Sequence, residues 1–334
     1  MTNGKDVPNS KNFCGGNFPD WLEVNLTDKC NGQCAWCIEK DGYHPEYHAP
    51  WHAIAAAAIS TFKLNIILLG GEPTLYPSIK ELVSSLHANG RRVWITTNGS
   101  LLTPLFSKET LSGIFGVNIS IHHYLMRRNE DITGVRLYDN TLSLAIDTLH
   151  KMNAVVRLNC NCIASQIDSV DEIRTYISYA KEIGADKIRF AELKNDDNGF
   201  VDLAEILDHK YGLNDNPFKD GCNSDAVIDG MPVNFRQMCG LQTRMRTAPE
   251  NPQGVAKQVL YYDGKLYDGW QTKEKDVNAQ DVIAILKLVK AGKMEVDDAA
   301  RLIDGQKEDK IDAVIIPNPA PPKITPARGG YCQY

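Results

Sequence analysis

Short runs of β-branched and apolar residues alternate, up to about residue 192, with longer stretches in which apolar residues recur every three or four positions. This alternation is typical of βαβ units and a parallel sheet. The predicted strands occupy residues 22–27, 65–69, 92–97, 116–121, 155–163 and 187–191. The helices predicted between them include 79–89, 142–152 and 169–183, with Gly90 and Gly184 where helices commonly end. Six repeats predict an α/β fold, a partial (β/α)6 TIM-like barrel with a small α+β C-terminal extension.

The alternation stops after the sixth predicted strand, where polar, turn-forming residues predominate. We therefore predict a polar N-terminal segment at 1–20, a barrel core at 21–195, a capping extension at 196–272, and a helical hairpin with a proline-rich tail at 273–334. Within the extension, Asp263-Gly264 separates two apolar runs and predicts a β-hairpin. The helical hairpin at 279–304 is expected to pack on the outside of the barrel or at an oligomer contact.

The composition and charge of the chain limit the classes of protein to which it could belong. The chain has 334 residues, of which 43% are hydrophobic and 23% charged, and no apolar run approaches the roughly 20 residues of a membrane helix, so we expect no membrane association. The N-terminus lacks the pattern of a secretory signal, which predicts a cytoplasmic location. In that reducing compartment the nine cysteines are expected to be thiols or metal ligands. The net charge of −6 does not indicate nucleic-acid binding, although a nucleotide-sized substrate stays open.

Three of the cysteines form a cluster directly after the first predicted strand. Cys30, Cys34 and Cys37 are spaced by three residues and then two, at the carboxyl end of a strand, where α/β folds carry their chemistry. Three thiolates ligate three irons of a 4Fe-4S cubane and leave the fourth iron open to an exchangeable ligand. The alternative is a structural zinc site, for which His44 or His48 could supply a fourth ligand.

This spacing, with Trp36 before the last cysteine, resembles the radical S-adenosylmethionine (SAM) superfamily. The resemblance implies an enzyme that reductively cleaves SAM to methionine and a 5′-deoxyadenosyl radical, which takes hydrogen from a substrate. It implies two cofactors, SAM and a 4Fe-4S cluster held by Cys30, Cys34 and Cys37. It also implies an electron donor such as flavodoxin or ferredoxin.

Two segments at the ends of the next strands support the resemblance. Gly70-Gly71-Glu72-Pro73 closes the second strand, where glycines allow close backbone approach and Glu72 offers an acceptor for an ammonium group. It resembles the superfamily's Gly-Gly-Glu-Pro element, which binds the methionyl amine of SAM. Thr97-Asn98 at the end of the third strand is similar to many superfamily members. Each segment alone is also compatible with a simple turn, but their order after the cysteines favours the functional interpretation.

Polar residues interrupt the later strands, although buried parallel strands are normally apolar throughout. They are Ser120 and His122 on the fourth strand, Asn159 and Asn161 on the fifth, and Arg189 and Glu192 on the sixth. The pattern predicts a ligand in the barrel lumen, unless a register shift of one residue exchanges the two faces. By the resemblance, Ser120 and Asn159 or Asn161 would contact the ribose and carboxylate of SAM, the backbone at 190–192 would contact adenine, and Trp36 would pack on adenine or cover the cluster.

Other residues on these strands have two interpretations each. His122 and His123 could donate a proton or hydrogen atom to a substrate radical, or form a polar rim. Cys160 and Cys162 share the opposite face from Asn159 and Asn161 and are predicted to be buried as small hydrophobes.

The C-terminal third resembles a SPASM or twitch extension, which carries additional Fe-S centres. The available ligands for a second cluster are Cys14, Cys222, Cys239 and Cys332. The stretch Tyr267-Asp268-Gly269-Trp270 lacks the cysteine that often follows at this point, so a second cluster is not favoured. Arg236, Arg244 and Arg246 could clamp a phosphate or carboxylate of the substrate, or form surface ion pairs.

The leading hypothesis is a radical SAM enzyme, of oxidoreductase, isomerase or lyase type, that acts on a small molecule, a nucleoside or a modified amino acid by dehydrogenation, epimerisation or rearrangement. The second is a peptide-modifying maturase, against which the residues before the first strand are too few for a leader-binding domain. The third, of another class, is a zinc-binding or nucleic-acid-binding protein without catalytic activity.

Overall fold

The computed structural model describes residues 21–102, 113–193, 199–207, 218, 223–237 and 258–271. The chain divides into two compact units, Met1–Lys273 and Glu274–Tyr334, and all described residues belong to the first. The predicted helical hairpin at 279–304 and the proline-rich tail lie outside the described residues. So do Cys14, Cys222, Cys239, Cys332, Arg244 and Arg246.

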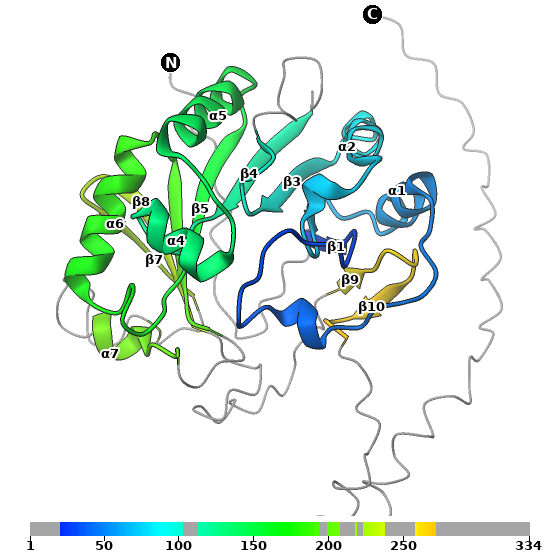
Figure 1. Cartoon of the computed structure of the whole chain (residues 1–334). Helices are drawn as coiled ribbons and strands as arrows, with labels where there is room; N and C mark the ends of the chain where they lie inside the picture. Colours follow the sequence, from blue (N-terminus) through cyan, green and yellow to red (C-terminus); the bar gives the residue numbers. More distant parts are fainter. Residues whose placement is uncertain are drawn as a thin grey trace, which may run out of the picture. The chain divides into compact units, whose positions relative to one another are not determined.

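One sheet, ten-stranded within the described part of the chain, organises this unit, in the order β10-β9-β1-β2-β3-β4-β5-β6-β8-β7 (Figure 1). The first six strands pair parallel with their neighbours in chain order. They are β1 (Trp21–Asn25), β2 (Asn65–Leu69), β3 (Arg92–Thr97), β4 (Ile114–Ser120), β5 (Val155–Asn161) and β6 (Lys187–Ala191). The predicted six-stranded parallel sheet is therefore confirmed, and it is an open sheet whose edge strands are β10 and β7.

Helices connect these strands, as the sequence predicts. They are α1 (Trp51–Ser60), α2 (Ile79–Ala88), α4 (Met126–Thr133), α5 (Asp139–Lys151), α6 (Val170–Glu182) and α7 (Leu203–Leu207), with short 3-10 helices η1 (Ile38–Asp41) and η2 (Pro73–Leu75). Gly90 and Gly184 follow α2 and α6 with φ of 74° and 89°, a left-handed conformation that glycine adopts at helix ends without steric cost. No helix among the described residues has both the length and the apolar composition to cross a membrane.

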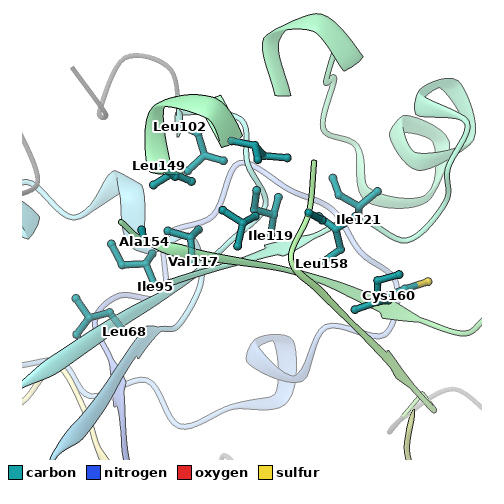
Figure 2. Packing of buried hydrophobic residues seen from close by; sticks show 14 of the residues in the cluster. Leu68, Ile95, Leu102, Val117, Ile119, Ile121, Leu149, Ala154, Leu158 and Cys160 are labelled. Atoms are coloured by element: carbon teal, nitrogen blue, oxygen red, sulfur yellow. The ribbon is translucent and has the colours of Figure 1, made fainter. Parts of the chain in front are cut away.

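The core lies between one face of the sheet and the helices. Ile95, Val117 and Leu158 point from neighbouring strands toward the same layer, where Leu149 of α5 meets them (Figure 2). Side chains alternate across a strand, so the next residues along each strand line the opposite face, which we call the inner face. On β5 the burial pattern alternates accordingly: Cys160 is 1% exposed, whereas Arg157, Asn159 and Asn161 are partly exposed.

The register predicted for the fifth strand is thereby confirmed. Asn159 and Asn161 share the inner face, and Cys160 and Cys162 are buried in the core. The polar positions of this strand are therefore where a ligand on the inner face could meet them.

The described part of the predicted extension at 196–272 adds strands to both edges of the same sheet. At one edge β8 (Met231–Arg236) pairs parallel with β6, and β7 (Asn223–Ile228) pairs antiparallel with β8. At the other, β9 (Gln258–Leu260) pairs parallel with β1, and β10 (Leu266–Asp268) completes a hairpin with β9. The hairpin predicted around Asp263-Gly264 is confirmed, and Gly264 has a φ of 82° in its turn. The likeness to a twitch extension stays a prediction.

Candidate active site

The three cysteines lie in one loop, between the end of β1 and the start of η1. Cys30 is exposed, and Cys34 and Cys37 are partly buried. Burial raises the pKa of Cys34 to about 11, and the neighbouring Cys37 and Cys30 thiolates contribute to the rise. The three sulfurs are therefore close enough to repel one another once ionised, which a bound cationic cluster would offset.

This donor set fits a 4Fe-4S cluster better than a single zinc ion. Among the described residues, no group of three or more His, Cys, Asp or Glu side chains converges on one metal position. The thiolates of a cubane bind separate irons, so they do not need to converge in that way. The histidines available for a zinc site are engaged elsewhere: His44 Nε2 lies 2.7 Å from the Glu39 carbonyl oxygen, and the His48 ring stacks on Tyr262 at 4.7 Å.

The glycine segment after β2 holds the beginning of the cysteine loop. Leu26 N donates to Leu69 O at 2.9 Å, Gly71 N to Thr27 O at 2.6 Å, and Glu72 N to Lys29 O at 2.8 Å. The parallel pairing of β1 and β2 thus continues beyond both strands. A Cβ on Gly71 would lie 2.7 Å from the Lys29 carbonyl carbon, which is shorter than real contacts allow. The glycine is therefore needed for the close approach of two backbones.

Glu72 joins the ends of β2 and β3. Its side chain is 1% exposed, and its Oε1 accepts hydrogen bonds from Thr74 N at 3.0 Å and from Thr97 Oγ1 at 2.7 Å. Its Oε2 accepts from Asn98 N at 2.7 Å. Pro73 follows as the first residue of η2. The structure thus brings the predicted residues Gly70, Gly71, Glu72, Pro73, Thr97 and Asn98 together, while the role of Glu72 toward an ammonium group stays a prediction.

Two residues that the sequence analysis did not single out complete the connection to β3. Asn98 Nδ2 donates to Asn31 Oδ1 at 2.7 Å, and Asn31 Nδ2 donates to Ser100 Oγ at 2.9 Å. Asn31 lies within the cysteine loop, so these bonds attach that loop to the end of the third strand. The only local signal was that asparagine and serine favour turns, which does not identify partners 67 and 69 residues away.

His122 connects the cysteine loop to β5. Its ring lies edge-on to Trp36 with 5.5 Å between centroids, and its Nδ1 accepts a hydrogen bond from Asn161 N at 3.1 Å. Burial lowers the pKa of His122 to about 4, so the ring is neutral near pH 7. Because Nδ1 is an acceptor, the proton of the neutral ring is on Nε2.

The two adjacent histidines, His122 and His123, have different surroundings. His123 is 0% exposed, its Nδ1 accepts from Leu125 N at 3.0 Å, and its ring packs against Tyr124. Burial and the charge of Arg128 lower the pKa of His123. Of the two predicted proton donors, only His122 contacts Trp36.

Of the remaining predicted residues, Ser120 and Asn159 lie on the inner face, whereas Glu192 follows the end of β6 and its side chain is bonded to α7. The prediction that Glu192 lines the lumen with Arg189 is therefore not supported. Ser120 is the register partner of Asn159, whose Oδ1 accepts from Arg157 Nε at 3.1 Å. Glu192 is 1% exposed, and its Oε1 accepts from Leu203 N at the start of α7, so its side chain supports that helix. Its backbone N–H donates to the carbonyl oxygen of Arg236 at the end of β8.

Comparisons with known proteins agree with this arrangement. Residues 24–163 match the family described as the Radical SAM superfamily. A protein of Metallosphaera sedula named "Probable GTP 3',8-cyclase" is 28% identical over 177 residues, which are 52% of this chain and 55% of that protein. A protein of the same name from Saccharolobus islandicus is 30% identical over 179 residues, covering 52% of this chain and 56% of its own length. The chain thus spans about half the length of the curated relatives it matches.

A solved structure shows the same fold. The crystal structure of Streptococcus suis SuiB superposes with a TM-score of 0.50 and 17% identity over 75% of this chain and 60% of that one. The expected fold class and family are confirmed, and the superfamily's cofactors are the predicted ones, a 4Fe-4S cluster and SAM. Residues 24–163, which include the cysteine loop and the Gly70–Pro73 segment, form a radical SAM superfamily domain.

Proposed function

We propose that this protein is a radical SAM enzyme whose cluster is held by Cys30, Cys34 and Cys37 and whose substrate lies on the inner face of the sheet. The observation that carries the proposal is the bonding of the cysteine loop to the ends of β2 and β3, through Gly71, Glu72 and Asn98. When bound, the cluster supplies the electron that splits SAM into methionine and a 5′-deoxyadenosyl radical.

The chain's own residues would position and shield these groups. Trp36 precedes Cys37 in the loop and packs edge-on against His122, so its ring would shield part of the cluster from water. Ser120, Asn159 and Asn161 present polar groups on the inner face and are the candidates for contacts with SAM. His122 holds a proton on Nε2 beside Trp36 and is the candidate donor to a substrate intermediate.

The substrate that the relatives favour is a nucleotide or another small molecule. The similar proteins of Metallosphaera sedula and Saccharolobus islandicus bear the name of a GTP cyclase, and the cytoplasmic setting expected from the sequence would supply a flavodoxin or ferredoxin as electron donor. The reaction would be a dehydrogenation, an epimerisation or a rearrangement, in which the cofactors carry out the difficult step. Peptide modification is the second candidate from the sequence and has no specific support among the described residues.

The test begins with anaerobic reconstitution of the full chain. We expect iron and sulfide in the ratio of a 4Fe-4S cluster, and 5′-deoxyadenosine on addition of dithionite and SAM. Cys34→Ala should abolish 5′-deoxyadenosine formation, because one iron loses its ligand. The matched control is Cys162→Ala, since Cys162 is 0% exposed in the core, and it should retain the cluster. Zinc in place of iron, or undiminished 5′-deoxyadenosine from the Cys34 variant, would refute the proposal.

A further inference from the structure

Three arginines occupy the inner face on three consecutive strands of the sheet. Arg157 lies on β5, Arg189 on β6 and Arg236 on β8, and all three are partly exposed. Arg189 pairs in register with Asn234, two residues before Arg236 on β8. The side chains therefore share one face at neighbouring positions, and none of them is needed for the apolar core.

The positive charge of these arginines is not balanced within the described part of the chain. Arg157 Nε donates to Asn159 Oδ1 at 3.1 Å and Arg189 Nε donates to Asn234 Oδ1 at 2.9 Å, so the partners are neutral amides. The ion pairs found among the described residues involve other side chains. Burial and the charge of Arg236 lower the pKa of Arg157 to about 10, and burial with the charges of Arg157 and Arg236 lowers the pKa of Arg189 well below its usual range.

Guanidinium groups keep their proton under physiological conditions, so a cluster of this kind is costly without a counter-charge. Glu23 and Asp225 act on Arg189, but their effect is smaller than that of the neighbouring arginines. One oxygen of Asp225 already accepts a hydrogen bond from Asn234 Nδ2 at 2.8 Å. An anion bound from solution would supply the missing charge.

Two polar atoms on the inner face have no hydrogen-bond partner among the described residues. Trp94 is 8% exposed, its Nε1 is buried without a hydrogen-bond acceptor, and the Arg157 guanidinium lies 6.0 Å from its ring centroid. Asn118 is 1% exposed, pairs in register with Arg157, and has an unpartnered Oδ1. Buried polar groups are normally hydrogen-bonded, so these two atoms offer one donor and one acceptor to a group bound beside the arginines.

We propose that Arg157, Arg189 and Arg236 bind a substrate group with two or more negative charges, as phosphate esters carry. This proposal rests on the proposed function, because it names the substrate class of the same inner face. Arginine forks match the oxygens of phosphate in pairs, and three of them exceed what a single carboxylate would neutralise. The site lies on β5, β6 and β8, whereas the cysteine loop is bonded to the ends of β2 and β3.

The test is calorimetric titration of the reconstituted full chain with inorganic tripolyphosphate at low ionic strength. We expect Arg157→Gln and Arg189→Gln each to weaken tripolyphosphate binding by about tenfold or more, since each removes one charged fork. Arg127→Gln is the matched control, because the Arg127 side chain is 89% exposed on α4, and it should bind like the unchanged chain. Unfolding midpoints of the variants verify that they are folded.

Further titrations identify which anionic group the arginines bind. Citrate binding that depends equally on the arginines would identify carboxylates as the source of the charge and would overturn the phosphate assignment. Equal tripolyphosphate binding by the unchanged chain and both variants, or no binding at all, would overturn the site itself. Loss of SAM binding in parallel would assign the arginines to SAM instead. If the unchanged chain makes no 5′-deoxyadenosine but the variants still lose tripolyphosphate, the proposed function fails and the anion site stands.

Discussion

His122 joins three segments of the candidate site through its backbone and its ring. His122 N donates to Asn129 Oδ1 on α4 at 2.7 Å, Asn161 N on β5 donates to His122 Nδ1, and the ring edge meets Trp36 in the cysteine loop. The ring is 6% exposed, and a protonated imidazole could not accept the hydrogen bond from Asn161. The neutral form is therefore built into the folded state.

This burial predicts a specific loss of stability in acid. The pKa of His122 is about 4 when folded, against roughly 6.5 in an unfolded chain, so between these values the unfolded chain binds a proton that the folded chain does not. The contribution is fully present above pH 6.5 and is lost as the pH falls toward 4, by about 2 kcal/mol at pH 5. We expect urea unfolding at pH 7 and pH 5 to show this loss, and His122→Asn, whose Oδ1 can replace Nδ1 as acceptor, to remove it. An identical pH dependence in both proteins would contradict the assignment.

The loop after β2 positions the cysteine loop through backbone hydrogen bonds. Gly71 must lie against Lys29, and Gly71 N and Glu72 N hold the chain that leads to Cys30. We expect Gly71→Ala to lower the iron content after reconstitution to less than half, because the added Cβ pushes the two loops apart. Gly90→Ala is the informative control: its φ of 74° imposes about 1 kcal/mol of strain, but its Cβ would meet nothing within 4 Å, so iron content should be retained. Equal iron in both variants would show that the close approach is not required.

The elements themselves differ in how far the sequence predicts them. β2, β3 and β6 have the predicted bounds, and the apolar runs of β2 and β3 end at residues that favour turns. The pairing of β9 with β1 was not predicted, since it joins Glu23 to Val259 and no local pattern encodes a contact at that separation. The same reason explains why Asn31 and Ser100 were missed and Arg157 was not grouped with Arg189: their relation depends on which loops and strands become neighbours.

Within the described unit, the cysteine loop is where several parts of the chain meet. Besides its bonds to the loops after β2 and β3, Gln33 N donates to Thr133 O at the end of α4 at 2.6 Å. The segment that follows the loop is bonded to the β9–β10 hairpin, through Ala49 N to Tyr262 O at 2.7 Å, and to the residues after it, through Tyr43 N to Gln271 O at 3.1 Å. A ligand that holds the three cysteines therefore restrains contacts between segments that are distant in the sequence.

This arrangement predicts that the cluster stabilises the folded chain in addition to its role in the reaction. A cluster that binds the folded chain and not the unfolded one raises the free energy of unfolding, and because the loop is bonded to β2, β3 and α4, the gain should appear in global unfolding. We expect the reconstituted chain to unfold at a higher temperature than the iron-free chain, by about 2–4 °C for each kcal/mol gained. Scanning calorimetry under anaerobic conditions measures the difference, and Cys34→Ser should show little of it. If the reconstituted and the iron-free chain unfold at the same temperature, the loop opens independently of the sheet. Its bonds to Asn98 and Thr133 then do not couple cluster binding to global unfolding.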